Sequence, residues 1–310
     1  MSSPLRPVAD GLVGLRTGIV NVYLAGPPGA GDGGWVLIDA ALPGFAGRIR
    51  HAAADRFGAG ARPAAVVLTH GHQDHVGALA SLLKSWGDVP VYAHPLELPY
   101  LTGRSAYPPP DPTVGGGALS ATSFLFSRGP FNFGDSVRPL PADGTVPGMP
   151  GWTWMPTPGH TPGHVSFWRE SDRTLVAGDA FVTQKQESLV GALTERTEVH
   201  GPPMYYTPDW DRARASVEAL AALEPEVAAT GHGVPLRGYA LRDALHYLAD
   251  NFEREAVPAH GRYVPVPALA DEDGVYSIPP PTTRQRVALG VGVGVLASAA
   301  LAFALRARRD

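Results

Sequence analysis

The stretch Ala65-Val66-Val67-Leu68-Thr69-His70-Gly71-His72-Gln73-Asp74-His75 decides how the rest of the chain is interpreted. Its first four residues are apolar and predict a short buried strand. The strand runs directly into a loop with three histidines and one aspartate within six residues. In a strand-like segment, residues two apart point to the same side, so His70 and His72 can converge on one ion. Asp74 and His75 begin the next predicted helix, where they can face a second ion.

Three more polar side chains stand at the ends of later predicted strands, each directly after a glycine. His160 lies in Thr157-Pro158-Gly159-His160-Thr161-Pro162-Gly163-His164, Asp179 follows Leu175-Val176-Ala177-Gly178, and His232 follows Val227-Ala228-Ala229-Thr230-Gly231. This placement is typical of a site built from loops over a rigid sheet. The sequence therefore predicts one metal centre with seven ligands: His70, His72, Asp74, His75, His160, Asp179 and His232.

The chain of 310 residues contains no cysteine, so any metal must be held by histidine or carboxylate side chains. Neutral imidazoles and carboxylates suit Zn²⁺, Mn²⁺ or Fe²⁺. Two such cations a few Å apart lower the pKa of a bridging water to about 7, which supplies hydroxide at neutral pH. We therefore expect two divalent ions, zinc first and manganese or iron as alternatives, and hydrolytic chemistry.

The run His70-Gly71-His72-Gln73-Asp74-His75 resembles the HxHxDH signature of the metallo-β-lactamase-fold superfamily. Asp39 after a strand, His160, Asp179 and His232 follow in that superfamily's order. The resemblance covers roughly residues 12–250 and implies an α/β fold, an αββα sandwich with the metal site at one edge. It implies one metal held by His70, His72 and His160, another held by Asp74, His75 and His232, and Asp179 as the bridge.

An aspartate at position 179 and the absence of cysteine resemble the glyoxalase II and lactonase branch, since the antibiotic-degrading members carry a cysteine in their second site. The resemblance implies a metal-bridging hydroxide that cleaves a thioester, a lactone or a related ester, with Asp74 as the predicted catalytic residue among the ligands. The basic cluster that holds glutathione in glyoxalase II is not evident, which disfavours a glutathione thioester.

Two other functions compete with hydrolysis. Persulfide dioxygenases share the scaffold and the signature, but they use a single iron and oxygen. A non-catalytic, membrane-tethered metal-binding protein is the other alternative. A nuclease of the same superfamily is disfavoured, because residues 1–283 carry 20 basic and 28 acidic side chains within a chain of net charge −4. This acidic balance argues against nucleic acid as the partner.

Several residues near the predicted ligands allow both a functional and a structural interpretation. Asp39 is a candidate for fixing a ligand or the signature loop, or it is a plain turn residue. We interpret His164 as a structural or supporting histidine. Tyr205 and Tyr206 could place a phenol near the reacting carbonyl, although such aromatics more often serve packing.

The remaining pattern alternates strands and helices. Strands are predicted at 19–24, 35–38, 65–68, 89–93, 152–155, 164–168, 174–177 and 226–230, and helices at 45–57, after residue 75, at 210–223 and at 239–255. Loop-forming residues break this rhythm at 97–150, a predicted lid insertion, and a second lid is expected at 183–209. Lys185 and Arg196 in the second lid could meet an acidic substrate.

The C-terminal segment Val287–Leu305 contains no charge and no proline, and as a helix it would span about 28 Å. Arginines flank both of its ends. The sequence therefore predicts a catalytic domain at 1–278, a proline-rich linker at 279–286, a transmembrane helix at 287–305 and a basic tail at 306–310. Gly290 and Gly294 form a GxxxG pattern that is compatible with helix pairing and a homodimer.

The N-terminus shows no apolar signal segment before Asp10. We therefore expect a membrane-anchored protein with its catalytic domain in the cytoplasm and a small-molecule ester or thioester as its partner.

Overall fold

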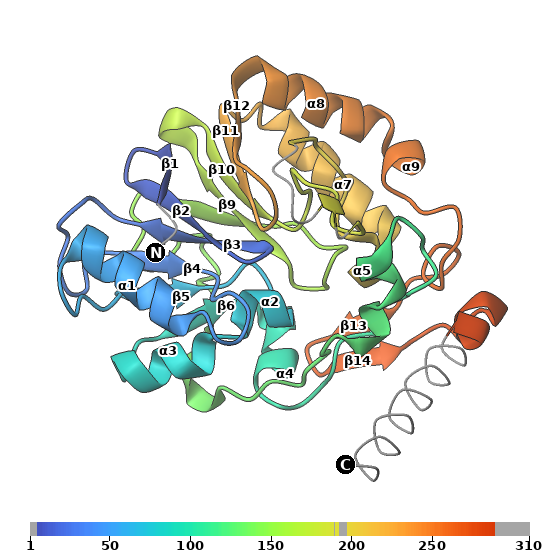
Figure 1. Cartoon of the computed structure of the whole chain (residues 1–310), viewed down its shortest axis with the longest axis horizontal. Coiled ribbons are helices and arrows are strands. Elements are labelled where there is room, and N and C mark those ends of the chain that lie inside the picture. The colour runs from blue at the N-terminus through green and yellow to red at the C-terminus, as the bar shows by residue number, and fades with distance from the viewer. Residues whose placement is uncertain (1–4, 189, 192–196, 289–310) are drawn as a thin grey trace, which may run out of the picture.

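The computed structural model describes residues 5–188, 190–191 and 197–288. Two β-sheets pack face to face, with helices on the outer face of each sheet (Figure 1). The first sheet runs β1 (Arg6–Ala9), β2 (Leu12–Thr17), β3 (Val20–Ala25), β4 (Val36–Ile38), β5 (Ala65–Val67), β6 (Val91–Ala93) and β7 (Val137–Pro139). The second runs β12 (Leu236–Arg237), β11 (Val227–Thr230), β10 (Thr174–Gly178), β9 (Val165–Arg169) and β8 (Thr153–Pro156).

The helices range from four-residue elements such as α2 to the 13-residue α7 and α8. The α-helices are α1 (Ala46–Phe57), α2 (Gln73–Val76), α3 (Leu79–Trp86), α4 (Leu98–Leu101), α5 (Ala118–Ala121), α7 (Trp210–Ala222), α8 (Gly238–Asp250) and α9 (Phe252–Glu255). Short 3₁₀ turns lie at η1 (Pro95–Glu97), η2 (Ser123–Leu125), η3 (Gly134–Ser136), η4 (Glu170–Asp172) and η5 (Met204–Tyr206). A separate hairpin pairs β13 (Leu269–Asp271) with β14 (Gly274–Ser277).

Alternate residues of each strand pack into different layers, because successive side chains point to opposite faces of a sheet. In the first sheet, Leu37 and Val66 join a core that also contains Ile49 of α1 and Leu82 of α3. Their neighbours Ile38 and Val67, with others, face the second sheet and form the core between the sheets. The expected inner two layers of an αββα sandwich follow directly from this pattern.

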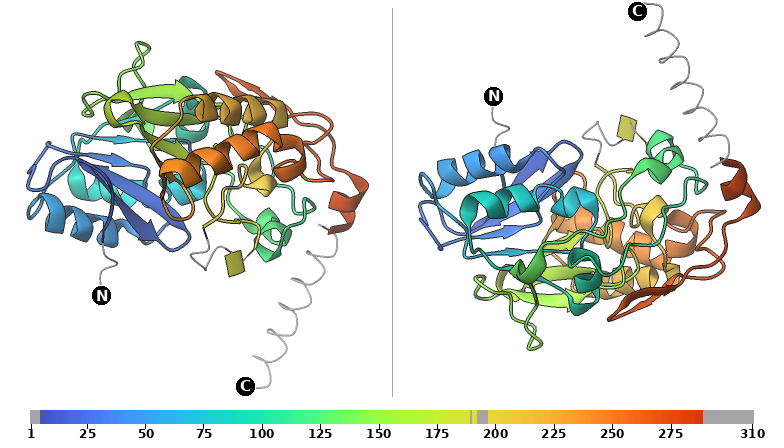
Figure 2. Two further views of the ribbon diagram at one scale, coloured as in Figure 1. Left: turned by 90° about the horizontal axis from the view of Figure 1, so that it is seen from above. Right: turned by 90° about the horizontal axis from the view of Figure 1, so that it is seen from below.

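The second sheet repeats the arrangement. Val176 faces the core between the sheets, whereas Leu175 and Ala177 pack with Val217 of α7 and Leu245 of α8. Figure 2 shows the N-terminal helices and the C-terminal helices on opposite outer sides of the paired sheets. The α/β sandwich expected from the sequence is therefore confirmed, and β1 and β2 are strands that the sequence analysis did not predict.

Parallel strand pairs bring the polar strand ends together. β4 pairs with β5 in parallel, and β10 pairs with β11 in parallel. The carboxyl ends of parallel neighbours meet at one edge of a sheet, where ligands bind in open α/β structures. Asp39 and His70 follow β4 and β5, and Asp179 and His232 follow β10 and β11.

The segment 97–150 contains more regular structure than the sequence indicated. It carries α4, α5, η2 and η3, and β7 joins the first sheet as an edge strand parallel to β6. Part of this segment is therefore built into the sandwich. Its role as a lid stays a prediction, as do the predicted domain boundaries.

The predicted transmembrane helix at 287–305 and the membrane anchor that it implied are wrong for the described chain. No helix in residues 5–188, 190–191 and 197–288 has the length and apolar character needed to cross a bilayer. Residues 289–305 of the predicted span, the glycines of the GxxxG pattern and the tail 306–310 lie outside the described residues.

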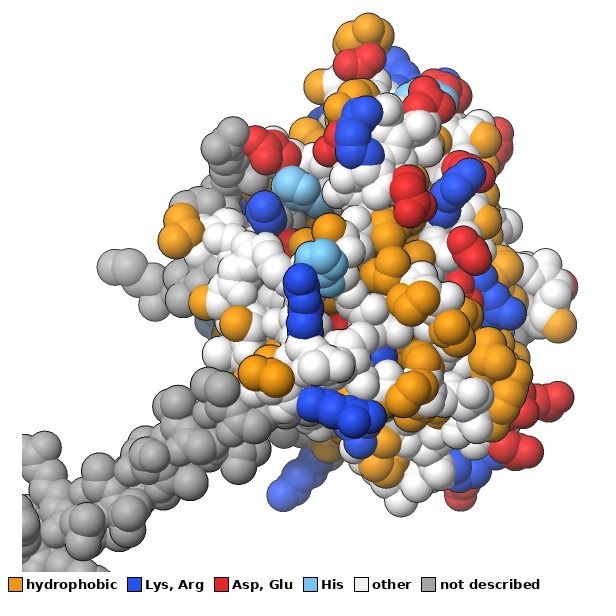
Figure 3. Space-filling model, turned by 90° about the vertical axis from the view of Figure 1, so that its right-hand side faces the viewer, with side chains coloured by type: hydrophobic (Ala, Val, Ile, Leu, Met, Phe, Trp, Pro, Cys, Tyr) orange, Lys and Arg blue, Asp and Glu red, His pale blue; other side chains and the backbone are white. Residues whose placement is uncertain are grey.

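Side chains of every class mix on the surface. Figure 3 shows the face at the right-hand side of Figure 1, where basic, acidic and apolar side chains are interspersed. Val266, Leu269, Tyr276 and Ile278, in and around the β13–β14 hairpin, are exposed apolar residues.

Candidate metal centre

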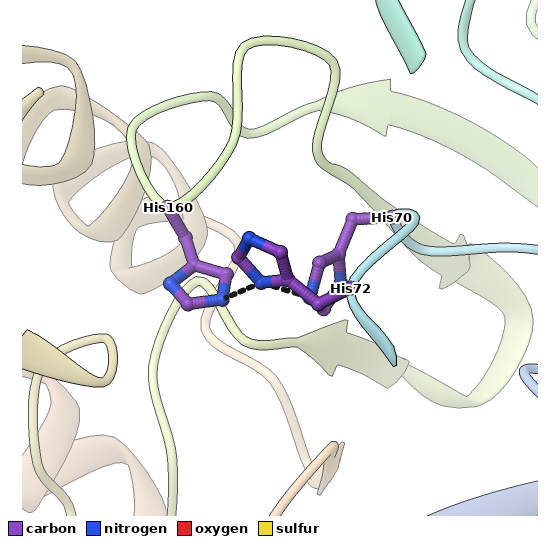
Figure 4. Close-up of side chains that lie close together, drawn as sticks. All are labelled: His70, His72 and His160. Carbon is purple, nitrogen blue, oxygen red and sulfur yellow. Dashed lines mark hydrogen bonds between the residues drawn. The ribbon is translucent and has the colours of Figure 1, made fainter. Parts of the chain in front are cut away.

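Three histidines converge at the edge where the two sheets meet. Nε2 of His70 lies 3.1 Å from Nδ1 of His72, and Nδ1 of His72 lies 3.0 Å from Nε2 of His160. Figure 4 shows the three imidazoles turned toward one another, His70 and His72 from the loop after β5 and His160 from the loop between β8 and β9. All three are buried. Three ring nitrogens this close form a group that could hold one metal ion.

A second group lies beside the first. Asp74, His75 and His232 present one ligand atom each within 4.8 Å of one another. Oδ2 of Asp74 lies 3.3 Å from Nε2 of His232 and 3.8 Å from Nε2 of His75. Asp74 and His75 come from α2, whereas His232 follows β11, so this group joins the two sheets.

Asp179 stands between the two groups. Its Oδ2 is 3.1 Å from Nε2 of His232 and 3.6 Å from Nε2 of His75, both in the second group. The same oxygen is 3.5 Å from Nε2 of His160 in the first group. The structure thus brings all seven predicted residues together, with Asp179 within 3.6 Å of histidines from both groups.

Hydrogen bonds behind the rings orient the histidines of the second group. Nδ1 of His232 donates to the carbonyl oxygen of Ile19 at 2.8 Å, which places the proton on Nδ1. Nδ1 of His75 donates to Oδ2 of Asp39 at 2.9 Å. Both rings therefore turn a free Nε2 toward the centre, and such outer partners are what fixes the orientation of metal-binding histidines.

Two rings of the first group, those of His70 and His160, are held in a similar way. Nδ1 of His70 lies 3.1 Å from the hydroxyl of Thr69, and Nδ1 of His160 lies 3.3 Å from the hydroxyl of Thr207. The Thr69 hydroxyl donates to Asp39, and the Thr207 hydroxyl donates to the carbonyl of Pro203. Each hydroxyl oxygen can therefore accept a hydrogen bond from the Nδ1–H group of its histidine. The sequence analysis missed Thr69, Thr207 and Ile19 because nothing in their local pattern marks them.

Asp39 connects the strand end before it to the signature loop. Its Oδ1 accepts the Thr69 amide hydrogen at 2.8 Å, and its Oδ2 accepts the Thr69 hydroxyl at 2.8 Å in addition to His75. Of the two interpretations of Asp39, these contacts favour the one in which it fixes a ligand and the loop.

His164 holds the backbone of Asp179. Its Nδ1 donates to the hydroxyl of Thr157 at 2.8 Å, and its Nε2 accepts the backbone amide hydrogen of Asp179 at 2.9 Å. A Cβ at position 178 would lie 2.6 Å from that Nε2, so the close approach needs Gly178. His164 thus makes the supporting contacts that the sequence analysis expected of it.

Burial keeps the first group neutral. It lowers the pKa of His72 to about 3 and, together with neighbouring histidines, holds the pKa of His70 and of His160 well below the ordinary value. These three rings therefore keep a lone pair available for a cation across the physiological range.

In the second group, neighbouring groups of opposite charge outweigh burial in setting the pKa values. Burial acts to lower the pKa of His232, but Asp179 and Asp74 raise it to about 10, and the carboxylates raise the pKa of His75 well above its usual value. Burial acts to raise the pKa of Asp179, but His232 and His75 hold it well below its ordinary range. The carboxylates therefore favour positive charge in this group, and a bound cation would take the place of the ring protons at Nε2.

Two buried polar atoms in the centre have no hydrogen-bond partner. They are Nε2 of His75 and Oδ1 of Asp179. Leaving such atoms unpaired costs about 1–3 kcal/mol each, and bound metal ions would be suitable partners for them. The donor set and these orphaned atoms fit a divalent metal site.

A pocket of about 100 Å³ opens onto the centre. Ligand side chains form part of its lining: His72, Asp74, His160, Asp179 and His232. The other lining residues are mostly apolar or aromatic: Ile19, Leu42, Gln73, Phe126, Pro203, Tyr205 and Tyr206. None of the lining residues in the described chain is a lysine or an arginine.

Tyr206 packs on the centre through its ring. The ring lies 4.4 Å from that of His72, at 30°, and its hydroxyl donates to the carbonyl of Ser127 at 3.1 Å. These contacts favour the packing interpretation of Tyr206. Lys185 lines a different pocket, with Glu187 and His200, and Arg196 lies outside the described residues.

The family model of the metallo-β-lactamase superfamily matches residues 15–232, which include all seven candidate ligands. The chain belongs to the metallo-β-lactamase superfamily. With that membership and a cluster of residues that could hold metal ions, it is a metal-dependent hydrolase of the superfamily. Membership does not by itself identify the glyoxalase II and lactonase branch.

Curated relatives agree with this family. The chain is 46% identical over 261 residues to the probable metallo-hydrolase YflN of Bacillus subtilis (strain 168), a match that covers 81% of this chain and 98% of YflN. It is 30% identical over 171 residues to the probable metallo-hydrolase YybB of the same organism, covering 55% of this chain and 64% of YybB.

Solved structures share the fold. The metallo-β-lactamase family protein TTHA1429 from Thermus thermophilus matches with a TM-score of 0.51 and 22% identity, over 78% of this chain and 79% of that one. A β-lactamase domain protein from Burkholderia ambifaria matches with a TM-score of 0.55 and 19% identity, over 82% of this chain and 77% of that one. At these identities the likeness concerns the fold alone.

Proposed function

We propose that the protein hydrolyses a compact, uncharged ester-like substrate, a lactone, a thioester or another ester, at a centre of two divalent ions. The observation that carries the proposal is the position of Asp179, whose Oδ2 lies 3.1 Å from His232 in one ligand group and 3.5 Å from His160 in the other. A carboxylate shared by two groups is the arrangement of two-metal hydrolytic sites.

The ligands divide between the two ions by position. His70, His72 and His160 would hold one ion, and Asp74, His75 and His232 would hold the other, with Asp179 between them. Zinc is the first choice and manganese or iron the alternatives. Bound there, the ions would supply hydroxide at neutral pH and polarise the substrate carbonyl.

Asp74 is the carboxylate best placed to act on the attacking water. Its side chain is 24% exposed and lines the pocket, against 2% exposure for Asp179. Burial acts to raise the pKa of Asp74, but His75 and His232 hold it below its usual range. Asp74 therefore stays ionised and can accept a hydrogen bond from water in the pocket, which orients that water toward the substrate.

The pocket supports a substrate without negative charge. Ile19, Leu42 and Phe126 form apolar walls, and no described lining residue is a lysine or an arginine. An anionic group bound against these walls, away from the ions, would lose its hydration without a cationic side chain in return. This favours small lactones and simple esters or thioesters over glutathione conjugates.

The first experiment is elemental mass spectrometry on the purified full-length protein, followed by a panel of lactones, thioesters and aryl esters. We expect about two divalent ions per chain and hydrolysis that is lost on chelation and restored by zinc or manganese. About one iron per chain with consumption of oxygen on a persulfide substrate would overturn the proposal.

Ligand variants test the assignment of the two groups. Asp74→Ala and His160→Ala should each lower the metal content by about one ion per chain. Asp32→Ala is the control, because Asp32 pairs with Arg62 on the surface. Full metal content in both ligand variants would refute the assignment.

A further inference from the structure

Glu97 is a fully buried carboxylate that does not belong to the seven ligands. It is the last residue of η1 and the first residue of the segment 97–150. Its Oε2 accepts the backbone amide hydrogen of Gly71 at 2.9 Å and a hydrogen bond from the hydroxyl of Tyr107. Its Oε1 accepts the hydroxyl hydrogen of Thr161 at 2.7 Å and the amide hydrogen of Gly163 at 2.9 Å.

These four bonds reach both loops of the first ligand group. Gly71 lies between His70 and His72, and Thr161 directly follows His160. One carboxylate therefore connects the loop after β5 to the loop between β8 and β9, which together carry all three histidines of the group.

Both loops approach Glu97 so closely that only glycine fits at the contact points. A Cβ at position 71 would lie 2.5 Å from the Tyr107 hydroxyl oxygen. A Cβ at position 163 would lie 2.9 Å from Cγ of Glu97. Real Cβ atoms do not come this near to other atoms without displacing them. Gly71 and Gly163 are thus explained by their close approach to Tyr107 and Glu97.

Tyr107 adds a second contact to the same ligand group. Its ring lies 4.6 Å from that of His72, inclined at 63°, and stacks on Tyr100 at 3.9 Å. The residue that donates to Glu97 therefore also forms one side of the space in which the His72 ring sits.

The energetics indicate a specific role for the charge. Burying a carboxylate costs several kcal/mol unless its lone pairs are filled. Each oxygen of Glu97 receives one backbone N–H and one hydroxyl, so its acceptor sites are used. An apolar residue would fill the same volume without that desolvation, but it could not join two loops by directed bonds.

We propose that Glu97 is a positioning residue for the metal centre, which holds the loops so that the nitrogens of His70, His72 and His160 converge before a metal binds. The second ligand group has its own supports, Asp39 and the carbonyl of Ile19. Glu97 therefore positions the ligands of only one of the two ions. The inference rests on the metal centre of the proposed function and not on its substrate.

Glu97→Gln in the full-length chain tests the role directly. The amide has nearly the same shape, but its NH₂ group must face one of the two backbone N–H donors, so one loop loses its anchor. We expect the affinity for one Zn²⁺ to fall about tenfold to hundredfold, while the other dissociation constant stays within twofold. Competition with a chromophoric zinc chelator measures both constants without any substrate.

Asp111→Asn is the matched control. Asp111 is also fully buried and holds two segments together, accepting from the Thr113 amide at 2.8 Å and from the Arg262 amide at 2.6 Å. Neither contact reaches a ligand loop. We expect a similar loss of thermal stability in the metal-free protein but unchanged zinc constants. Equal loss of zinc affinity in both variants would mean general destabilisation and would overturn the proposal.

Tyr107→Phe keeps the proposal testable if Glu97→Gln does not fold. It removes one donor to Glu97 and keeps the ring beside His72. Its control is Tyr263→Phe, because the Tyr263 hydroxyl donates to the carbonyl of Pro109 at 2.6 Å, away from the ligand loops. We expect a severalfold loss of affinity for one ion in the first variant alone. Zinc constants within twofold of the wild type in both Glu97→Gln and Tyr107→Phe would refute the role.

The same titration separates this inference from the proposed function. A wild-type protein that binds one ion, or that cleaves none of the esters, would contradict the two-ion hydrolase. The effect of Glu97→Gln on the ion that binds would still decide the positioning role.

Discussion

Oδ2 of Asp39 lies 2.9 Å from Nδ1 of His75. Because the carboxylate can only accept, Nδ1 carries the proton of this bond and Nε2 faces the centre. Asp39 adopts a positive φ of 61°, a conformation that asparagine and aspartate tolerate better than most residues. The backbone conformation at the end of β4 thus places the Asp39 carboxylate against His75 of α2.

Asp39→Asn should weaken metal binding without unfolding the protein. The amide tolerates the same backbone conformation, but its NH₂ group cannot accept from His75 and Thr69 as the carboxylate does. We expect about a tenfold to hundredfold loss of affinity for one ion, measured by chelator competition. Asp32→Asn, on the exposed pair with Arg62, serves as the control and should bind zinc like the wild type.

Metal removal should destabilise the fold. A ligand present at 100 times its dissociation constant stabilises the native state by about 2.7 kcal/mol. We therefore expect chelation to lower the thermal midpoint by several degrees, in a calorimetric scan, and zinc to restore it. Superimposable scans of the chelated and the zinc-loaded protein would contradict a metal site that joins both sheets.

Tyr206→Phe should have a small effect on hydrolysis. The Tyr206 hydroxyl donates to the carbonyl of Ser127, so its removal loosens that contact and leaves the ring on His72. We expect kcat/KM to change by less than about tenfold, or about 1.4 kcal/mol. Tyr206→Ala, which also removes the ring, should cost more. A loss above a hundredfold in Tyr206→Phe would instead indicate that the phenol contacts the reacting carbonyl.

The stability that the η1 turn contributes to the fold should decrease at acid pH. Nδ1 of His94 accepts the Leu96 amide hydrogen at 3.2 Å and caps η1, and burial lowers the pKa of His94. Because the folded protein resists protonation here, the stability from this group is present above about pH 6.5 and is lost as pH falls.

His94→Asn provides the comparison, since asparagine caps without titrating. We expect the free energy of unfolding of the wild type to fall relative to the variant by about 1 kcal/mol between pH 7 and pH 5. Urea denaturation of both metal-free proteins measures the difference, and the other histidines contribute equally to both. Parallel pH profiles would show that the cap does not titrate.

The candidate ligands could be picked out from the sequence because each one lies in a recognisable local pattern. His160, Asp179 and His232 are polar residues that follow a glycine at a strand end, and His70 to His75 form one compact motif. Alternation of apolar residues along β5 and β10 likewise predicts the layers of the sandwich.

The supports of the ligands could not be predicted, because they depend on packing between distant segments. The acceptor for His232 is the backbone carbonyl of Ile19, 213 residues earlier in sequence. Glu97 begins a segment whose prolines and glycines indicated only a loop, and its partners at Gly71 and Gly163 become visible only when the two loops meet. The apolar run at 287–305 shows the opposite error, since composition alone predicted an element that the described chain does not contain.

The spread of the ligands along the chain sets an order for metal loading during synthesis. His70 and His72 leave the ribosome early, but their group is complete only when His160 has been made, and the other group must wait for His232. Neither group can present all of its candidate ligands until residues from the second sheet have been made. The complete centre and the second half of the sandwich therefore form together.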